Sequence, residues 1–120
     1  MRTALPVWGT DLSPVFDFAQ RILVIEIDRC REVSRYMFDL THRSLTSRSE
    51  RLRELGVDVL ICGAVSNALA ELITGIGIGL IAWRCGPAEE VLQAYITGSL
   101  DDPRFVMPGH REGGIQSTGT

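Results

Sequence analysis

The clearest hydrophobic pattern lies in the N-terminal third of the chain, where three segments have the character of β-strands. Residues 2–7 form a short apolar run, and Arg21–Asp28 (RILVIEID) is rich in β-branched residues and ends in apolar–polar alternation. Residues 32–40 follow after a gap of about three residues, which is the spacing of a hairpin. Pro6 lacks a backbone donor, so we expect pairing of the first strand to stop or bulge there. A loop at residues 8–14 separates the first two strands.

The spacing becomes helical in the middle of the chain. The sequence SRSE at residues 47–50 fits a capping box, in which a hydroxyl caps the helix and a glutamate follows three positions later. Gly56 supplies a C-terminal stop. Residues 57–62 (VDVLIC) are almost continuously apolar, which is typical of a parallel strand covered on both faces.

One more strand and two more helices complete the pattern. Ser66 is expected to cap a helix that ends at Gly75, and residues 78–83 (IGLIAW) have strand character. Pro87 suits the first position of a last helix, in which Glu89 and Glu90 favour the positive end of the dipole.

The order βββαβαβα predicts an α/β fold for residues 1–100, with one five-stranded mixed sheet flanked by three helices. Right-handed crossovers place the last two strands parallel to the first. After Leu100 the chain loses its periodicity and becomes rich in glycine and proline. Residues 101–120 are therefore predicted to form a flexible C-terminal tail, with residues 105–107 as an exception.

This topology brings several loops to one edge of the sheet. The first, fourth and fifth strands all end there, and ligands of open α/β sheets bind at that carboxyl edge. The edge is expected to collect the loop after the first strand, Cys62 and Cys85, and also His42 after the third strand. Cys30 is expected at the opposite end, far from both other cysteines.

The two strand-end thiols allow two interpretations. Cys62 and Cys85 each precede a glycine and a helix N-terminus, where free N–H groups favour a thiolate, and two such thiols suit a soft metal or an iron–sulfur species. Alternatively, both are small buried residues that close tight turns, a common place for cysteine. The chain contains no CxxC motif, and three cysteines in a cytosolic protein do not indicate a disulfide framework.

Charge excludes one class of partner. The formal net charge is -3, with 12 basic and 15 acidic residues, whereas nonspecific nucleic-acid binding needs a concentrated basic surface. The densest basic group, Arg48, Arg51 and Arg53, alternates with glutamates and indicates a solvated helix face. No apolar run approaches the ~18 residues of a membrane span, and the first residues lack a signal-peptide core, so we expect a cytoplasmic protein.

One glycine motif and several isolated polar residues do not indicate a binding site by themselves. GIGIG at residues 75–79 resembles a dinucleotide fingerprint, but it follows a helix and precedes a strand, the reverse of the order the fingerprint needs. His42 and His110 are isolated histidines in polar segments, and Asp11, Ser13 and Asp17 suit turn capping in the first loop.

Three stretches resemble the dinitrogenase iron–molybdenum cofactor biosynthesis family. They are ALPVWGTDLSPVFDFAQRILVIEID, LRELGVDVLICGAVSNALAELITGIGI and GPAEEVLQAYITGSL, which together extend over nearly all of residues 2–100. The resemblance implies a ribonuclease-H-like mixed sheet. It also implies a non-enzymatic protein that carries or inserts iron–sulfur or iron–molybdenum clusters, with metallocluster-assembly or nitrogenase-like proteins as partners in nitrogen fixation.

The resemblance supports a set of candidate site residues. Cys62 stands at the family's cysteine position, and the predicted cofactor-binding residues are Cys62, Gly63, Cys85, Ser13 and Phe16, with Cys62 and Cys85 as metal ligands. Two positions depart from the family pattern. A His-Phe-Gly triplet is frequent in the family's first loop, where this chain has residues 15–17 (VFD), and Gly63 is followed by alanine rather than a second glycine.

The alternative function is a diverged member that acts as a protein-interaction or regulatory module without a bound cluster. An acyl-transfer or redox enzyme built on Cys62 lacks an evident general-base partner. A ribonuclease-H-like nuclease needs clustered carboxylates, commonly with one on the first strand, and residues 2–7 contain none.

Overall fold

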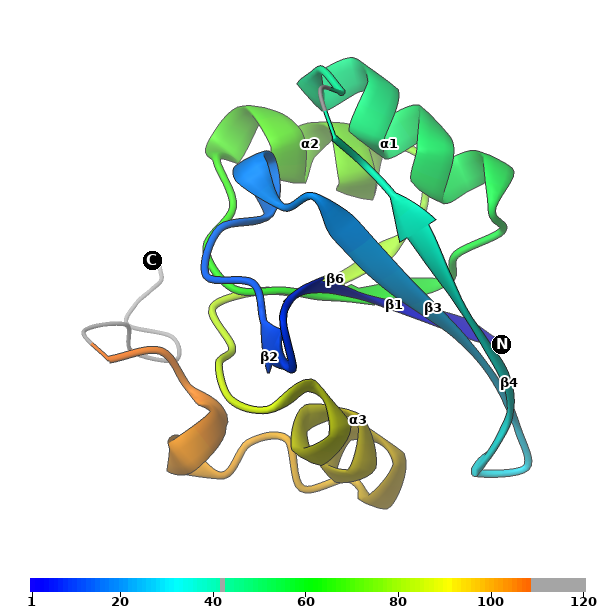
Figure 1. Cartoon of the computed structure of the whole chain (residues 1–120), viewed down its shortest axis with the longest axis vertical. Coiled ribbons are helices and arrows are strands. Elements are labelled where there is room, and N and C mark those ends of the chain that lie inside the picture. Colours follow the sequence, from blue (N-terminus) through cyan, green and yellow to red (C-terminus); the bar gives the residue numbers. More distant parts are fainter. Residues whose placement is uncertain (42, 109–120) are drawn as a thin grey trace.

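A mixed β-sheet with helices on both faces forms the centre of the molecule, seen in a computed structural model that describes residues 1–41 and 43–108 (Figure 1). The strands are β1 (Arg2–Trp8), β2 (Asp11–Leu12), β3 (Arg21–Asp28), β4 (Arg31–Asp39), β5 (Val59–Ile61) and β6 (Gly79–Ile81). The helices are α1 (Leu45–Glu54), α2 (Asn67–Gly75) and α3 (Ala88–Thr97), with 3-10 turns η1 (Phe16–Phe18) and η2 (Pro103–Phe105).

The sheet has the predicted mixed character. Its order is β4-β3-β1-β5-β6, and β1 pairs parallel with β5 and antiparallel with β3. β5 and β6 are also parallel, so the last two strands lie parallel to the first, as predicted. The short β2 pairs with β1 and makes the sheet six-stranded instead of five-stranded. Its two residues fall within the segment that was expected to be loop.

The expected interruption at Pro6 is absent from the pairing with β3, whereas the pairing with β5 does end before Pro6. Pairing with β3 continues through Pro6 to Val7, and the carbonyl of Pro6 accepts a hydrogen bond of 2.8 Å from the backbone N of Ser13. The N and C=O of one strand residue point to the same side, so the missing donor of Pro6 lies on the side away from β3. β5 pairs only with Thr3 and Ala4 on that side, so no ladder bond is lost.

The hairpin between β3 and β4 is tighter than expected. Only Arg29 and Cys30 separate the two strands, and both have positive φ angles of 53° and 62°. Two central residues in the left-handed region are the signature of a type I′ turn, whose twist matches that of paired strands.

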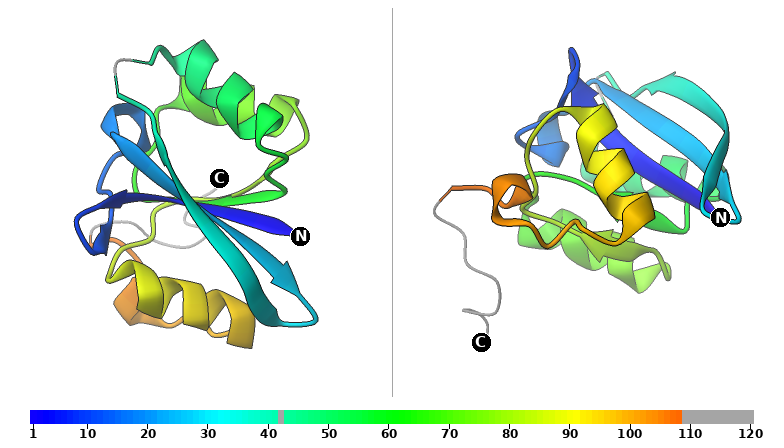
Figure 2. Two further views of the ribbon diagram at one scale, coloured as in Figure 1. Left: turned by 45° about the vertical axis from the view of Figure 1, so that its right-hand side comes forward. Right: turned by 90° about the horizontal axis from the view of Figure 1, so that it is seen from below.

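Two apolar layers cover the sheet. One lies under α1 and α2 and contains Ala4, Ile22, Leu60, Leu69 and Ile73, whereas the other lies under α3 and contains Leu5, Leu23, Ile25, Val91 and Leu92. Figure 2 shows α1 and α2 on one side of the sheet and α3 on the other. Neighbouring residues of β1 and β3 alternate between the two layers, as the period of two in a strand requires.

The helix boundaries correct two predictions about caps. Ser44 is the N-cap of α1, and its hydroxyl accepts a hydrogen bond from the backbone N of Ser47 at 3.1 Å. The predicted capping box at Ser47 is therefore one turn too late, and Glu50 pairs with Arg53 instead. Pro87 is the N-cap of α3 rather than its first residue.

The folded chain continues beyond Leu100. Phe105 in η2 is only 2% exposed and belongs to the layer under α3, and Val106 bridges to Arg84. The predicted exception at residues 105–107 is thus part of the packed structure. The division of the chain at residue 100 stays a prediction, and residues 109–120 lie outside the described part. Within residues 1–41 and 43–108, none of the helices has the length and apolar character needed to cross a bilayer.

Candidate functional site

The carboxyl edge of the sheet brings together the loop after β1 and the turns after β5 and β6. The backbone N of Ala64 donates to the carbonyl of Pro14 at 2.8 Å, and the backbone N of Phe16 donates to the carbonyl of Ala64 at 2.9 Å. A Cβ on Gly63 would lie 2.5 Å from the Pro14 oxygen and 2.6 Å from the Ser13 oxygen. Gly63 is therefore required by the close approach of the first loop.

The turn after β6 joins the same edge. The backbone N of Trp83 donates to the carbonyl of Gly63 at 2.9 Å, and the backbone N of Arg84 donates to the carbonyl of Cys62 at 3.0 Å. Trp83 has a φ of 64°, which is unfavourable for a bulky residue and is held by these flanking hydrogen bonds.

The predicted placement of the three cysteines is confirmed. Cys62 directly follows β5, and Cys85 stands next to Arg84, which bonds to the Cys62 carbonyl. Cys30 lies in the turn between β3 and β4, at the other end of the sheet. The same end holds the start of β1, because the backbone N of Ile27 near the end of β3 donates to the carbonyl of Met1.

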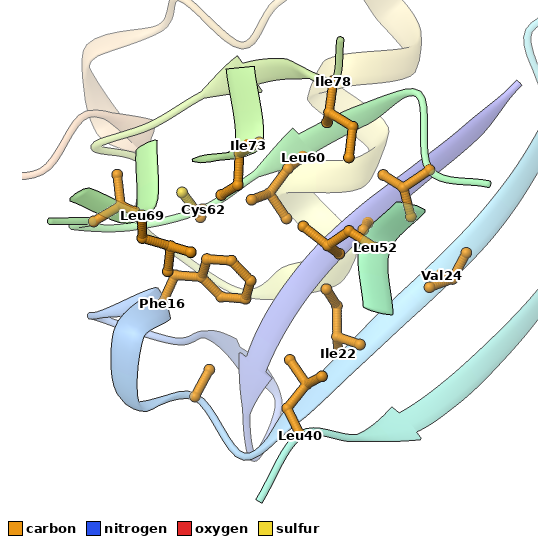
Figure 3. Packing of buried hydrophobic residues seen from close by; sticks show 14 residues of the cluster. Phe16, Ile22, Val24, Leu40, Leu52, Leu60, Cys62, Leu69, Ile73 and Ile78 are labelled. Atoms are coloured by element: carbon orange, nitrogen blue, oxygen red, sulfur yellow. The ribbon is translucent and has the colours of Figure 1, made fainter. Parts of the chain in front are cut away.

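The Cys62 side chain points into the core and has no exposed surface. Figure 3 shows it among Leu60, Leu69, Ile73 and Phe16, in the layer under α1 and α2. Burial, and to a lesser extent the nearby Asp17 carboxylate, raises the pKa of the Cys62 thiol to about 12. The thiol is therefore protonated at neutral pH, and a helix N-terminus nearby does not make it a thiolate.

The Cys85 side chain lies on the opposite side of the sheet. Its thiol is partly exposed and contacts the carbonyl of Arg104 at 3.8 Å, and its backbone N donates to the carbonyl of Phe105 at 2.9 Å. Phe105 belongs to the layer under α3, whereas Cys62 belongs to the layer under α1 and α2. Both cysteines therefore stand at the carboxyl edge of the sheet, but their thiols point to different sides of it.

The side chains of Ser13 and Phe16 are buried and stabilise the loop, so neither is accessible to a ligand at the edge. Phe16 is completely buried and is among the largest side chains of its core layer. Ser13 is 6% exposed, and its hydroxyl donates to the carbonyl of Val15 at 3.4 Å. Of the predicted cofactor-binding residues, only Cys85 retains a partly exposed side chain.

The N-terminus of α2 already holds an anion. The carboxylate Oδ1 of Asp17 accepts a hydrogen bond of 2.9 Å from the backbone N of Ser66, and the Ser66 hydroxyl caps Leu69. A carboxylate at this end is favoured by the helix dipole. Asp17 had been expected to cap a turn within its own loop, and it instead reaches the helix after Cys62.

Arg48 of α1 binds the loop after β1 through its guanidinium group. It was predicted to lie on a solvated face, but it is 4% exposed, and Nη1 donates to the carbonyls of Ala19 at 2.5 Å and Phe16 at 3.3 Å. Burial lowers the pKa of its guanidinium. The remaining arginines of the predicted group do form the expected pairs, Arg51 with Glu54 and Arg53 with Glu50.

An open groove of about 590 Å³ lies at this edge. We call it the carboxyl-edge groove, and it is lined by Val7, Trp8, Gly9, Ser13, Pro14, Val15, Phe18, Ala19, Gln20 and Arg21. Trp8 is 75% exposed and Phe18 is 81% exposed, although both are large and apolar. Exposed aromatic side chains that border one groove mark a binding surface.

Sequence reasoning missed Trp8 and Phe18. The signal was present, because Trp8 directly precedes Gly9 in the first turn and Phe18 directly follows Asp17, so neither belongs to a periodic apolar stripe. Arg21 was placed near this edge and is exposed there, with no ion pair among the residues that the structure describes.

The donors that the sequence proposed for a cluster do not converge. Among residues 1–41 and 43–108, no three His, Cys, Asp or Glu side chains are placed to hold one metal ion. Cys62 would also have to leave the core and lose a proton before it could bind iron. His42 and His110 lie outside the described residues. This arrangement does not fit a cluster ligated by Cys62 and Cys85 together.

Searches by sequence matched no family model and no curated protein. Comparison with solved structures did find similar folds. PH0822 has a TM-score of 0.78 at 16% identity, covering 82% of this chain and 90% of the other. A protein of Methanocaldococcus jannaschii with the provisional name of a dinitrogenase has a TM-score of 0.68 at 16% identity, with the same shares covered.

A third similar structure is a Thermotoga protein provisionally named NifB and assigned to the DUF35 family. Its TM-score is 0.67 at 16% identity, and the match covers 99% of this chain and 98% of the other. At this identity the likeness concerns the fold and carries no residue roles with it. The mixed α/β sheet with three helices described above is therefore a fold that this chain shares, over 82% to 99% of its length, with these solved proteins.

Proposed function

We propose that this chain is a non-enzymatic accessory protein of a nitrogenase-related kind, which acts by binding a partner protein at the carboxyl-edge groove. Support for the nitrogenase-related part comes from the fold, because two similar structures carry the provisional names dinitrogenase and NifB. The resemblance of three sequence stretches to the cofactor biosynthesis family points the same way.

The observation that favours partner docking over cluster carriage is the orientation of the two thiols. Cys62 is fully buried with a raised pKa, and Cys85 lies on the other side of the sheet beside Arg104. In addition, Asp17 occupies the helix N-terminus that would otherwise attract an anionic ligand. What the edge offers to solvent is instead aromatic surface at Trp8 and Phe18.

The groove has the composition of a protein-interaction surface. Aromatic and arginine side chains are enriched at the energetic centres of interfaces, and here Trp8, Phe18 and Arg21 border one groove. The surrounding loop is firmly held, since Arg48 and Asp17 fix it to α1 and to the start of α2. A preorganised loop loses little conformational entropy on binding.

A photo-crosslinking amino acid at Phe18 tests this function in anaerobically grown cells of the source organism. We expect crosslinks to a metallocluster-assembly protein, identified by mass spectrometry. The matched control carries the same amino acid at Ile76, an exposed apolar residue at the end of α2, and should not capture that protein. Equal capture at both sites, or none at Phe18, would contradict the proposal.

Cluster carriage is the second candidate, favoured by the family position of Cys62. Anaerobic reconstitution with iron and sulfide, followed by desalting and metal analysis, separates the two functions. We expect no stoichiometric iron and sulfide in the wild-type protein. Stoichiometric uptake that is lost in Cys62→Ser and retained in Cys30→Ser would establish the carrier function instead.

A further inference from the structure

The outer edge of β4 is open in the described part of the chain. β4 ends the strand order, and Figure 2 shows it at the outside of the sheet with the described helices set back from it. It is nine residues long, whereas the other edge strand, β6, has three. A long open edge presents unpaired N–H and C=O groups to any strand that can lie beside it.

The backbone groups that face outward can be assigned. The backbone N of Leu40 donates to the carbonyl of Gln20 at 2.7 Å, and the pairing of β4 with β3 is regular from Ser34 to Asp39. In an antiparallel pair, hydrogen-bonded and non-bonded positions alternate. Residues 34, 36 and 38 therefore bond to β3, and Arg35, Met37 and Asp39 direct their backbone groups to the open edge.

The register irregularity limits the part of β4 that can pair. It lies between Glu26 and Ile27 of β3, which oppose Ser34 and Glu32, so Val33 is the extra residue of a bulge. A bulge twists the strand and disturbs its ladder. The regular segment that remains runs from residue 34 to residue 39.

The side chains of this segment are unusually apolar for an exposed edge. Tyr36 is 62% exposed and Met37 is 49% exposed, and Tyr36 and Phe38 lie on one face with ring centroids 6.4 Å apart. Arg35, Met37 and Asp39 lie on the opposite face. They are two positions apart along the strand, and they pair with Ile25, Leu23 and Arg21 of β3. In the order Arg-Tyr-Met-Phe-Asp, the residues at equal distances from Met37 are complementary: Tyr36 and Phe38 are both aromatic, and Arg35 and Asp39 have opposite charges.

We propose that β4 pairs antiparallel with β4 of a second copy of this chain, centred on Met37, to form a dimer with one continuous sheet. In this register Arg35 lies opposite Asp39 of the second copy, Tyr36 lies opposite Phe38, and Met37 lies opposite itself. Opposite charges and aromatic pairs at directly facing positions stabilise antiparallel strands. The outward backbone groups of residues 35, 37 and 39 all find partners.

Neighbouring registers lack this complementarity. Centring on Arg35 places two arginines opposite each other and Met37 opposite the bulged Val33. Centring on Tyr36 places Arg35 opposite Met37. In an antiparallel pair related by a two-fold axis, facing residues lie on the same side of the sheet. Among these three registers, only the one centred on Met37 places opposite charges at facing positions.

Arg35 is already positioned for this role. Its guanidinium contacts Glu32 and Glu89 at 2.6 Å each, which holds the side chain on the α3 side of the sheet.

Sedimentation equilibrium over a range of concentrations measures the association. We expect a reversible dimer for the wild type, and Met37→Lys should weaken it by about tenfold or more, because two lysines would face each other. Val33→Lys is the matched control, an exposed apolar residue of the same strand outside the paired segment, and should leave the dissociation constant within about twofold. Thermal unfolding by circular dichroism verifies that both variants fold.

A disulfide test fixes the register. In a Cys30→Ser, Cys85→Ser background, Met37→Cys should form an intermolecular disulfide on mild oxidation, since hydrogen-bonded antiparallel pairs have Cα atoms about 5.5 Å apart. Val33→Cys in the same background should not. A monomer at every concentration, a dimer that survives Met37→Lys, or equal crosslinking from both positions would each overturn the proposal.

Discussion

Asp17 and Ser66 are joined by a hydrogen bond of 2.9 Å from the Ser66 backbone N to the Asp17 carboxylate, although they stand 49 residues apart. Ser66 is the N-cap of α2, so the first loop helps to cap a helix that belongs to the second half of the chain. This bond ties the groove-bearing loop to the turn after Cys62.

Replacing Asp17 by alanine should destabilise the protein by about 1 kcal/mol, because it removes a carboxylate from a helix N-terminus and leaves the Ser66 N–H without that acceptor. Asp17→Asn, which keeps an acceptor oxygen, should cost less. Urea denaturation measures both. Asp101→Ala, at an exposed aspartate, is the control and should be close to neutral. An Asp17→Ala variant as stable as wild type would show that the bond contributes nothing.

Gly63→Ala should cost several kcal/mol, or prevent folding, because the new Cβ meets two backbone oxygens at 2.5 and 2.6 Å. The matched control is Gly75→Ala at the end of α2, where a Cβ meets nothing within 4 Å. That change should be neutral or stabilise by up to about 1 kcal/mol. Thermal and urea unfolding of the pair provide the comparison, and equal stabilities would refute the close approach.

Cys62 gives the stability a dependence on alkaline pH. Its folded-state pKa is raised from 9.0 to about 12, so above pH 9 the unfolded chain loses a proton that the folded chain keeps. Stability should fall between about pH 9 and pH 12, at up to about 1.4 kcal/mol per pH unit from this group. Cys62→Ala removes the contribution, so the difference between wild type and variant isolates it from other groups that titrate there.

Cys62→Ser distinguishes packing from ligation. A buried hydroxyl without a partner should cost about 1–3 kcal/mol, and the Cys62 site is fully enclosed. In the folded protein, Ellman's reagent should react with Cys30 and Cys85 and spare Cys62 until unfolding. Rapid labelling of three thiols in the native state would contradict the buried placement.

Phe105 should anchor the segment after Leu100. Phe105→Ala is expected to cost about 3–5 kcal/mol, since the side chain is 2% exposed in the layer under α3. A chain ending at residue 100 should lose comparable stability. A chain ending at residue 108 should keep nearly all of it, as the aperiodic, glycine-rich composition of the last residues predicts. Melting temperatures of the three variants decide this.

Several elements followed from local patterns alone. The β3–β4 hairpin was predicted from β-branched runs, and α2 and α3 ended where Gly75 and Gly98 indicated. The cap of α1 was misplaced by three residues, because Ser44 and Ser47 are both good caps and local sequence does not choose between them. The ribonuclease-H-like classification and the cluster-binding roles stay predictions.

What the sequence by itself determined is the succession of strands and helices, the parallel crossovers and the meeting of Cys62 and Cys85 at one edge of the sheet. These depend on hydrophobic period, turn residues and the handedness of crossovers, all of which are local or general. Only the tertiary structure decided where the side chains point. Cys62 shares a face with Leu60, two positions earlier, and α2 closes over it, whereas Trp83 in the left-handed region redirects the chain before Cys85. Side-chain direction at a strand end depends on register and on the packing of distant segments, so no local pattern in the chain could specify it.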